Sequence, residues 1–468
     1  MRLHRGRTTA SLRGRVRWVF LGIVLASLWL WLVKAALAAA PPCAPAAAIA
    51  SPVPPAALPP MLTLAEALRL FRSSGLDLLL ADAAVASAHG SLRIARSLYN
   101  PGLSASRGST TTYDPKQCGS PGCSDVQYSG SVSDQGAVLD VLSGKRHLRV
   151  AAAQQALRAA ELSRRDAERT VGFLVKQQYA AAVLAKASLA FAAESRASNE
   201  QTFRLVETRY EAGAVSEADV ARAEGAELES EQAYDLAAQS LRQAKVALAF
   251  LLGVRSSIPD YDVGDEVLAR GDPAALVTAS PESLIALALA QRSDVRAAEA
   301  QRARAEAALA LARRLRLPDV SLAAQYTREG TGQSAIQPPT TAFGLSFTAP
   351  LFYRHQGEIA MASADLRAQE VQRARVGAQV VSDVEGGLAA FHSARRRLDR
   401  MDSRQLERAR RARDLVQLQY EMGAASLLEL LDAQRTLISV GVERLQILSD
   451  YWTAVFELEQ AVGTELRQ

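Results

Sequence analysis

The sequence contains the same short turn twice. It reads "RYEAGAVSEADVARAE" at residues 209–224 and "QYEMGAASLLELLDAQ" at residues 419–434. Its residues Tyr210, Glu211, Gly213, Ala214 and Ser216 recur 210 positions later, and the same offset carries Gly253 onto Gly463. Self-similarity in a fixed order is typical of an internal duplication. The chain is therefore expected to fold as two similar halves.

A second correspondence, at an offset of 217, defines how each half begins. It carries Asp77 onto Asp294 and Pro101 onto Pro318. A stretch rich in Gly, Pro and Asp lies between the halves and is expected to connect them. The expected segments are a first repeat at 62–255, a connector at 256–279 and a second repeat at 280–465.

Each half has the same expected order of elements. A first helix of about 30 residues ends at a proline, as helices commonly do. Two extended segments follow. Residues 145–211 and 357–421 then contain no proline, so each predicts a rod on the order of 100 Å long. Its apolar positions, such as Val380, Val384 and Leu388, recur every three or four residues and predict a packing stripe that continues to Phe391.

The repeated turn is expected to be the tip of a helical hairpin. Gly213 and Gly423 are placed to end the two outgoing helices, since glycine accepts the left-handed conformation that follows a helix. Ser216 and Ser426 are placed as N-caps of the returning helices, each of about 35 residues. The chain would therefore carry two equivalent hairpins.

Alternation with a period of two marks the extended segments. It is clearest at 320–327 and 342–350, where apolar and small polar side chains take turns. The segments 102–114 and 126–142 show it more weakly, as strands of membrane barrels often do. An ordinary soluble antiparallel sheet alternates in the same way, so the pattern alone leaves both interpretations open.

Residues 1–38 have the composition of a secretory signal. An arginine-rich start is followed by the apolar run "WVFLGIVLASLWLWLV" and by a small-residue cleavage site at 36–38. A retained membrane anchor is the alternative, and Cys43 raises the further one of a lipid anchor. A Pro- and Ala-rich linker is expected at 39–60. No later apolar run approaches the length of a spanning helix, so any other membrane crossing would need strands.

Charge and motifs argue against several classes of function. The net charge of +5 lies partly in the leader, and no basic patch with interleaved aromatics follows, so no nucleic-acid partner is expected. The sequence contains no nucleophile with a base, no phosphate-binding glycine loop and no zinc signature, so neither an enzyme nor a cofactor is expected. Cys118 and Cys123 lie in a turn-rich stretch of an exported chain, which favours a disulfide over the alternative of a metal site.

Four strands per chain cannot satisfy both edges of a sheet in a bilayer, where unpaired backbone groups cost several kcal/mol each. Copies must therefore share one barrel. Two chains would give eight strands and a filled interior, whereas three would give twelve strands and a bore. The expected fold is mainly α with a small β part: long antiparallel helical hairpins form an α-barrel, and four strands per chain contribute to a trimeric 12-stranded transmembrane β-barrel.

In this order, these features resemble the outer-membrane factors of tripartite efflux and type I secretion systems, the TolC family. The resemblance covers nearly everything after the leader. It rests on "LTLAEALRL" at the start of the first half, on the prolines after the first helices, on "PLFYRHQGEIA" after the last strand and on the two tips. The segments "GKRHLRVAAAQQAL" and "RHQGEIA" look most like the heavy-metal cation efflux branch.

The resemblance implies a homotrimer in the outer membrane with a large periplasmic part. An adaptor protein would dock on the hairpin tips, under an inner-membrane pump of the RND or ABC type. The channel would be passive and would export small molecules or metal cations. The alternatives are the outer-membrane component of type I protein secretion and, from a different class, a soluble periplasmic coiled-coil scaffold.

The resemblance also assigns roles to residues near the tips. Asp219 and Tyr420 match a pair whose contact between neighbouring hairpins holds the tunnel shut. Glu429 and Asp432 match acidic positions that ring the lumen; six carboxylates in a trimer would select for cations and raise one another's pKa values, whereas two solvated acids are the alternative. Ala425 stands where some members carry a gating arginine, so packing and the Asp219–Tyr420 hydrogen bond are expected to hold the closed state. The residues expected to contact the adaptor are Gly213, Ala214, Val215, Ser216, Gly423, Ala424, Ala425 and Ser426.

Overall fold

A computed structural model describes residues 57–112, 123–269, 271, 273, 276, 279–329 and 339–465. The expected secretory signal, Cys43 and the linker as far as residue 56 lie outside the described residues. So does Cys118, and of Cys123 only the backbone is described, so the expected disulfide stays a prediction. Within the described part of the chain, no helix combines the length and the apolar character needed to cross a membrane.

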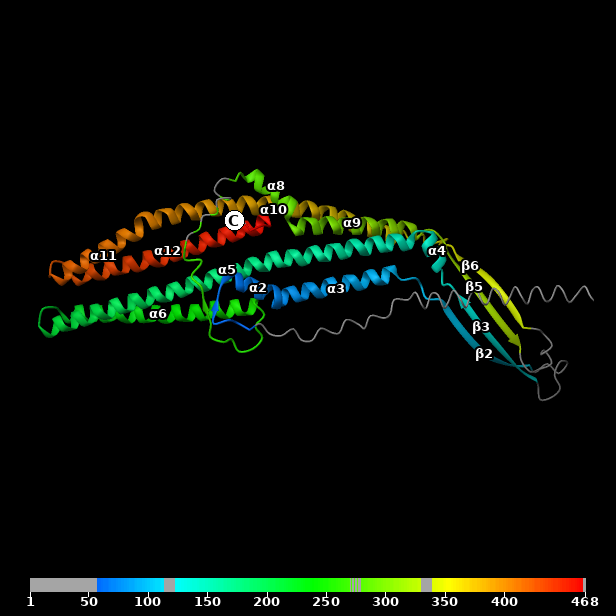
Figure 1. Ribbon diagram of the computed structural model, residues 1–468, viewed down its shortest axis with the longest axis horizontal. Coiled ribbons are helices and arrows are strands. Elements are labelled where there is room, and N and C mark those ends of the chain that lie inside the picture. Colours follow the sequence, from blue (N-terminus) through cyan, green and yellow to red (C-terminus); the bar gives the residue numbers. More distant parts are fainter. Residues whose placement is uncertain are drawn as a thin grey trace, which may run out of the picture. The chain divides into compact units, whose positions relative to one another are not determined.

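The first half runs from a short strand through a sheet segment to a long helical hairpin (Figure 1). Its elements are β1 (Met61–Leu62), α2 (Leu64–Ser74), α3 (Leu76–Arg96), β2 (Gly102–Thr112), β3 (Cys123–Ser133), α4 (Ala137–Leu142), α5 (Lys145–Glu211) and α6 (Glu217–Leu251). The 67-residue α5 confirms the first predicted rod.

The second half repeats this order, except that the described residues contain no helix equivalent to α4 and one long helix is interrupted. The connector contains β4 (Asp262–Val263), and the second half then consists of α8 (Pro281–Gln291), α9 (Ser293–Arg314), β5 (Asp319–Glu329), β6 (Thr340–Thr348), α10 (Gln356–Arg400), the π-helix η1 (Met401–Gln405), α11 (Leu406–Glu421) and α12 (Leu427–Val462). The start of β2 corresponds to that of β5, and the start of β3 to that of β6, at the same offset that carries Asp77 onto Asp294.

The first helix of each half is broken, so the prediction of one continuous helix there is wrong. The breaks fall at Gly75 (φ −59°, ψ 126°) and at Arg292 (φ −63°, ψ 130°), which correspond at the same offset. A Cβ at Gly75 would lie only 2.6 Å from the ring and the carbonyl oxygen of Phe71. Both breaks also contact distant segments, because the Ser74 carbonyl lies against Gly253 and Arg292 donates to Asp383, so tertiary packing overrides helix propensity there.

The second rod is also interrupted, because Met401–Gln405 form the π-helix η1. Met401 is buried, and an unbroken α-helix would turn residues 405 and 408 inward next. Instead those residues are exposed, while Leu406 packs against the core and Ala409 is buried. The additional residue in the π turn shifts the apolar stripe by one position.

Residues 137–142 are a further correction. The sequence predicts an extended segment over 126–142, but β3 ends at Ser133 and α4 begins after Gly136, whose φ of 80° is left-handed. Asp134 accepts hydrogen bonds from the backbone N–H groups of Gly136 and Leu322. The strand therefore ends in a turn that also binds the neighbouring strand β5.

The four long strands form one antiparallel sheet in the order β2-β3-β5-β6. On one face, serine hydroxyls pair across the strands at 2.7 Å; these pairs are Ser104–Ser131, Ser106–Ser129 and Ser321–Ser346. The other face carries large exposed apolar side chains, namely Leu103, Tyr128, Leu322, Tyr326, Phe343, Leu345 and Phe347. Within the described residues, β2 and β6 are open edges.

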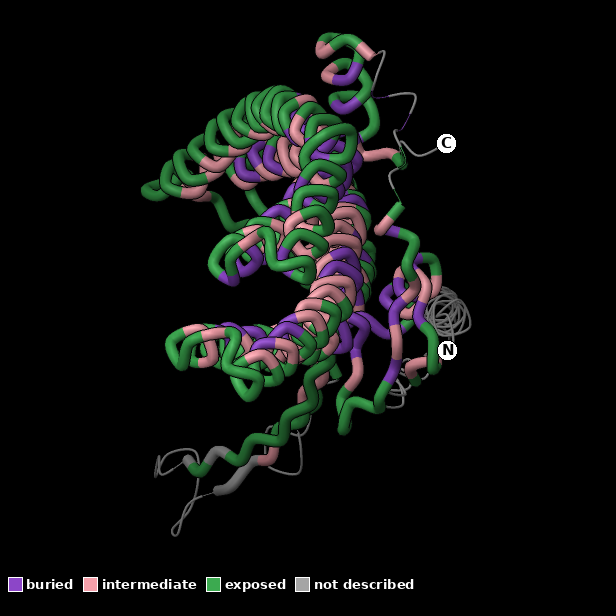
Figure 2. Tube along the Cα trace, turned by 90° about the vertical axis from the view of Figure 1, so that its left-hand side faces the viewer, coloured by how far each residue is buried: buried purple, intermediate pink, exposed green. Residues whose placement is uncertain are grey.

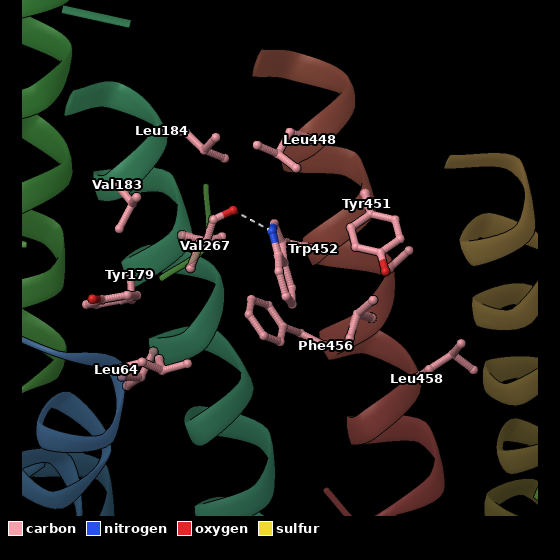
Figure 3. Packing of buried hydrophobic residues seen from close by; sticks show 14 of the residues in the cluster. Leu64, Tyr179, Val183, Leu184, Val267, Leu448, Tyr451, Trp452, Phe456 and Leu458 are labelled. Atoms are coloured by element: carbon pink, nitrogen blue, oxygen red, sulfur yellow. Dashed lines mark hydrogen bonds between the residues drawn. The ribbon is translucent and has the colours of Figure 1, made fainter. Parts of the chain in front are cut away.

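The main core lies where α12 packs between α5 and α10 (Figure 3). Trp452 is buried there, and its indole N–H donates to the carbonyl oxygen of Val267 at 2.6 Å, which ties the connector to α12. Figure 2 places buried residues where helices meet and exposed residues on their outer sides. Val380, Val384, Leu388 and Phe391 are buried, which confirms the predicted stripe.

Candidate functional site: the hairpin tips

Both tips are built on a left-handed glycine. Gly213 has φ 73° and Gly423 has φ 75°. The residue after each glycine closes the turn, because the N–H groups of Ala214 and Ala424 donate back to the carbonyl oxygens of Arg209 and Gln419, respectively. These bonds satisfy carbonyls at the ends of α5 and α11. The predicted helix ends are confirmed.

The returning helices begin with capping boxes. The Ser216 hydroxyl accepts from the Asp219 N–H, and the Asp219 carboxylate accepts from the Ser216 N–H at 3.2 Å. Ser426 and Glu429 repeat the arrangement, with 2.7 Å between the Ser426 nitrogen and the Glu429 carboxylate. Both serines are thus N-caps, as predicted, and both acids have a structural role in the turn.

These hydrogen bonds lower the pKa of both carboxyl groups. The hydroxyl and then the N–H of Ser216, with the Arg222 charge, lower the pKa of Asp219; the N–H and then the hydroxyl of Ser426 lower that of Glu429. A lowered folded-state pKa stabilises the caps above the ordinary values of 3.8 and 4.5, and this contribution is lost as pH falls below them. A ring of carboxylates between subunits would instead raise the pKa of Glu429, and that expected rise stays a prediction.

Within the single chain, Asp219 and Tyr420 form no hydrogen bond with each other. Asp219 bonds Ser216 and, at 3.0 Å, Arg222. Tyr420 is buried, and its hydroxyl has no hydrogen-bond partner among the described residues. Asp432 is exposed on α12. The contact of Asp219 with Tyr420 between neighbouring hairpins therefore stays a prediction.

A small apolar cluster holds the two tips side by side. Val206, Tyr420, Leu427 and Leu430 are buried in it, and Ala425 packs against it from the second tip. An alanine at position 425 therefore contributes packing, and no charge, to the turn. The expectation that packing also holds the closed state of the tunnel stays a prediction.

Arg209 is a tip residue that the sequence reasoning missed. Its guanidinium donates to the carbonyl oxygens of Tyr420 and Glu421 at 3.1 and 3.0 Å and lies 4.5 Å from the centre of the Tyr420 ring. A cation at the carboxyl end of α11 is favoured by the helix dipole and by the ring face. A comparison of the two tips could have indicated this residue, because Arg209 is replaced by Gln419 at the equivalent position of the second tip.

The two halves with their tips also match a known protein family. The family model described as "outer membrane efflux protein" matches residues 68–254 and 284–464. The chain belongs to this family. The two matched stretches fall one in each half, and the expected resemblance is confirmed.

Curated relatives within this outer membrane efflux protein family are distant. The pyoverdine export outer membrane protein OpmQ of Pseudomonas putida is 28% identical over 240 residues, which cover 49% of this chain and 48% of the relative. OpmQ of Pseudomonas aeruginosa is 29% identical over 181 residues, 37% of each chain. The chain thus spans about half the length, or less, of the curated relatives it matches.

Solved structures share the fold over most of the chain. The CmeC outer membrane channel of Campylobacter jejuni superposes with a TM-score of 0.73 at 18% identity, covering 86% of both chains. CusC superposes with a TM-score of 0.72 at 21% identity, covering 86% of this chain and 92% of CusC. The efflux family is one of outer-membrane proteins, and the chain has the helical hairpins and small β part of TolC-type channels.

Proposed function

We propose that the chain is the passive outer-membrane channel of a tripartite efflux system. It works as a homotrimer, with a periplasmic adaptor protein on its hairpin tips and an inner-membrane pump of the RND or ABC type that supplies the energy. The observation that carries this proposal is the four-stranded sheet, which has one apolar face, one hydroxyl-rich face and two open edges.

The two faces fit two solvents. The apolar face, with Phe343, Leu345 and Phe347 each at least 68% exposed, suits outer-membrane lipid. The serine pairs on the other face suit a water-filled lumen. The open edges β2 and β6 must be paired in a bilayer, and further copies of the same sheet supply the missing strands. Three copies give the twelve-stranded barrel.

We propose the domain organisation that the sequence predicts. It consists of the signal at 1–38, the linker at 39–60, the repeats at 62–255 and 280–465, and the connector at 256–279. The matching helix breaks at Gly75 and Arg292 support the duplication. The family match to 68–254 and 284–464 also supports it.

The cargo is a small molecule or a metal cation. OpmQ is named for the export of pyoverdine, which supports a small-molecule cargo for its relative. The resemblance to the heavy-metal branch supports a cation. Growth of a deletion strain on zinc, on copper and on dyes separates these classes, because only the exported compound becomes more toxic without the channel.

Fractionation and conductance test the channel itself. The full chain, expressed with its leader, is expected in the outer-membrane fraction as a trimer by native mass spectrometry of detergent extracts. In planar bilayers, these trimers are expected to give discrete conductance steps. A monomer recovered from the periplasmic wash, with its sheet intact, would overturn the proposal and favour a soluble scaffold.

The closed state is proposed to depend on Tyr420. In the trimer its hydroxyl would donate to Asp219 of a neighbouring hairpin, and Glu429 and Asp432 would line the entrance. Tyr420→Phe keeps the buried ring and removes only the hydroxyl. Loss of one hydrogen bond per contact shifts the equilibrium constant between the closed and the open state by about two- to tenfold. We therefore expect a higher conductance or open fraction in planar bilayers.

Tyr210→Phe is the matched control, because Tyr210 is the equivalent residue of the first tip and is 44% exposed. It should leave conductance at the parent level. An unchanged conductance in Tyr420→Phe, or an equal increase in both variants, would contradict the proposed role of Tyr420.

A further inference from the structure

The helical layer of one chain ends in two different helices. α6 packs on α5, α5 packs on α12, and α12 packs on α11, so α6 and α11 are the outer helices of the two hairpins (Figure 1). α5 and α11 run toward the tips, and α6 and α12 return from them. If copies stand side by side in a ring, α6 of one copy therefore meets α11 of the next in antiparallel orientation.

Acids outnumber bases on α6, whereas η1 and α11 carry a row of exposed arginines among acids. On α6, Glu224, Glu231 and Asp235 are exposed. On η1 and α11, the exposed cations include Arg404, Arg408 and Arg411. None of these six side chains has an ion-pair partner among the described residues of its own chain, whereas many other charged residues, including the nearby pairs Arg444–Asp402 and Arg435–Glu229, do.

The two sets lie at matching heights above the tips. Glu231 follows Ser216 by fifteen residues, and Arg408 precedes Gly423 by fifteen. Asp235 and Arg404 are each nineteen residues from the same two reference positions. At a rise of 1.5 Å per residue, these levels are about 22 and 28 Å from the tips. The same count places Asp219 level with Tyr420.

Apolar side chains accompany the charges. Leu415, Leu418 and Met422 are each at least 51% exposed on the tip-ward part of the α11 side, and they continue the spacing of Arg408 and Arg411 in steps of three and four. Leu228 and Leu236 are 52% and 66% exposed on α6. Such a stripe on each helix is typical of a packing seam without its partner.

Glu227 on α6 is partly buried and lies near Glu231 of α6 and Glu200 of α5. Burial and then the negative charges of Glu231 and Glu200 raise its pKa, against the weaker influence of Arg204. Cations from another helix would relieve this repulsion. Arg411 lies one residue further from its tip than Glu227 does from Ser216.

We propose that α6 of one copy packs against η1 and α11 of the next through an ion ladder in which Asp235 faces Arg404, Glu231 faces Arg408 and Glu227 faces Arg411. This interface rests on the proposed trimeric channel and specifies how its periplasmic tube closes. Along this ladder each copy presents acids on one edge and arginines on the other, so head-to-tail contacts are favoured over contacts between like edges. Head-to-tail contacts of one kind generate a closed ring.

Charge reversal tests the ladder in the full-length trimer. Arg408→Glu replaces attraction by repulsion at three interfaces, so it should raise the protein concentration at which half of the chains are monomeric by about tenfold or more in low-salt detergent. The double variant Arg408→Glu with Glu231→Arg should restore the parent value. Salt at about 1 M should reduce the difference in this concentration between Arg408→Glu and the parent, because salt screens the charges.

Arg410→Glu is the control, since Arg410 is exposed on the same helix but two residues round from Arg408, away from the stripe. Equal weakening by Arg410→Glu, or no recovery in the double variant, would overturn the ladder while trimers still form. A parent chain that forms no trimer would instead overturn the proposed channel, and the ladder with it. The two failures are therefore distinguishable.

Discussion

Arg292→Ala is expected to destabilise the chain by about 3–5 kcal/mol, the cost of removing one partner from a buried ion pair. Arg292 is 4% exposed. Its guanidinium donates to Asp383 at 2.9 Å, to Asp294 at 2.7 Å and to the carbonyl oxygen of Ala461 at 3.2 Å. It thereby joins the break between α8 and α9 to α10 and to the end of α12, and alanine would leave these acceptors without their donor.

The pH dependence gives this prediction a specific signature. Burial acts to raise the pKa of Asp294, but the hydrogen bond and charge of Arg292, with the charge of Arg169, hold it below the ordinary 3.8. This contribution is present above pH 3.8 and is lost as pH falls through the lowered value. The deficit of Arg292→Ala, measured by denaturant unfolding, should therefore be largest near neutral pH and shrink on acidification.

Arg302→Ala is a suitable control for Arg292→Ala. Arg302 also pairs with two acids, Glu299 and Glu306, but its side chain is 28% exposed and theirs are 46% and 63% exposed. Ion pairs with this much exposure contribute little to stability, so Arg302→Ala should hardly change the free energy of unfolding. If both variants lose similar stability, or if the Arg292→Ala deficit is independent of pH, the buried ion pairs are not what stabilises this junction.

Gly253→Ala is expected to destabilise by about 2–5 kcal/mol, through backbone strain together with overpacking. Gly253 ends α6 with φ 85°. A Cβ there would lie 2.1 Å from the carbonyl oxygen of Ser74, which is backbone and cannot move aside as a flexible side chain could. The substitution would therefore push α6 away from the break between α2 and α3.

Two further glycines separate strain from overpacking in the Gly253 prediction. Gly213 has a similar φ of 73°, and nothing lies within 4 Å of the position that a Cβ would take, so Gly213→Ala should cost only the strain of about 1–2 kcal/mol. Gly463 has φ 84°, and its nearest neighbour is the Arg292 side chain at 3.3 Å, so its cost should lie between the two. Equal thermal shifts in all three variants would refute the proposed clash at Ser74.

Local patterns in the sequence were sufficient for most of the architecture. The absence of proline predicted the long helix α5, and alternation predicted β5 and β6, because these signals depend on neighbours along the chain. The breaks at Gly75 and Arg292 were not predicted, since they depend on packing against distant segments. The π-helix was missed for a related reason: "MDSRQ" contains neither glycine nor proline, and only the shifted burial of Leu406 and Ala409 reveals it.

The tip residues also differ in whether the local sequence pattern is sufficient to predict their roles. Ser216 and Ser426 were predictable as N-caps, because a capping box is a local pattern in the sequence. Arg209 was not, because its partners are main-chain carbonyls in the other half of the chain. Asp219 and Tyr420 were assigned through resemblance, and a single chain cannot join them if their contact forms between subunits.

The π-helix makes the two halves unequal in a way that matters for protein engineering. A chain in which α5 replaced α10, η1 and α11 opposite α12 would lack the π turn that directs Leu406 and Ala409 toward the core. From that point to the tip, its second rod would present the wrong side to its partner. We therefore expect the two rods not to be interchangeable, although the two halves share one order of elements.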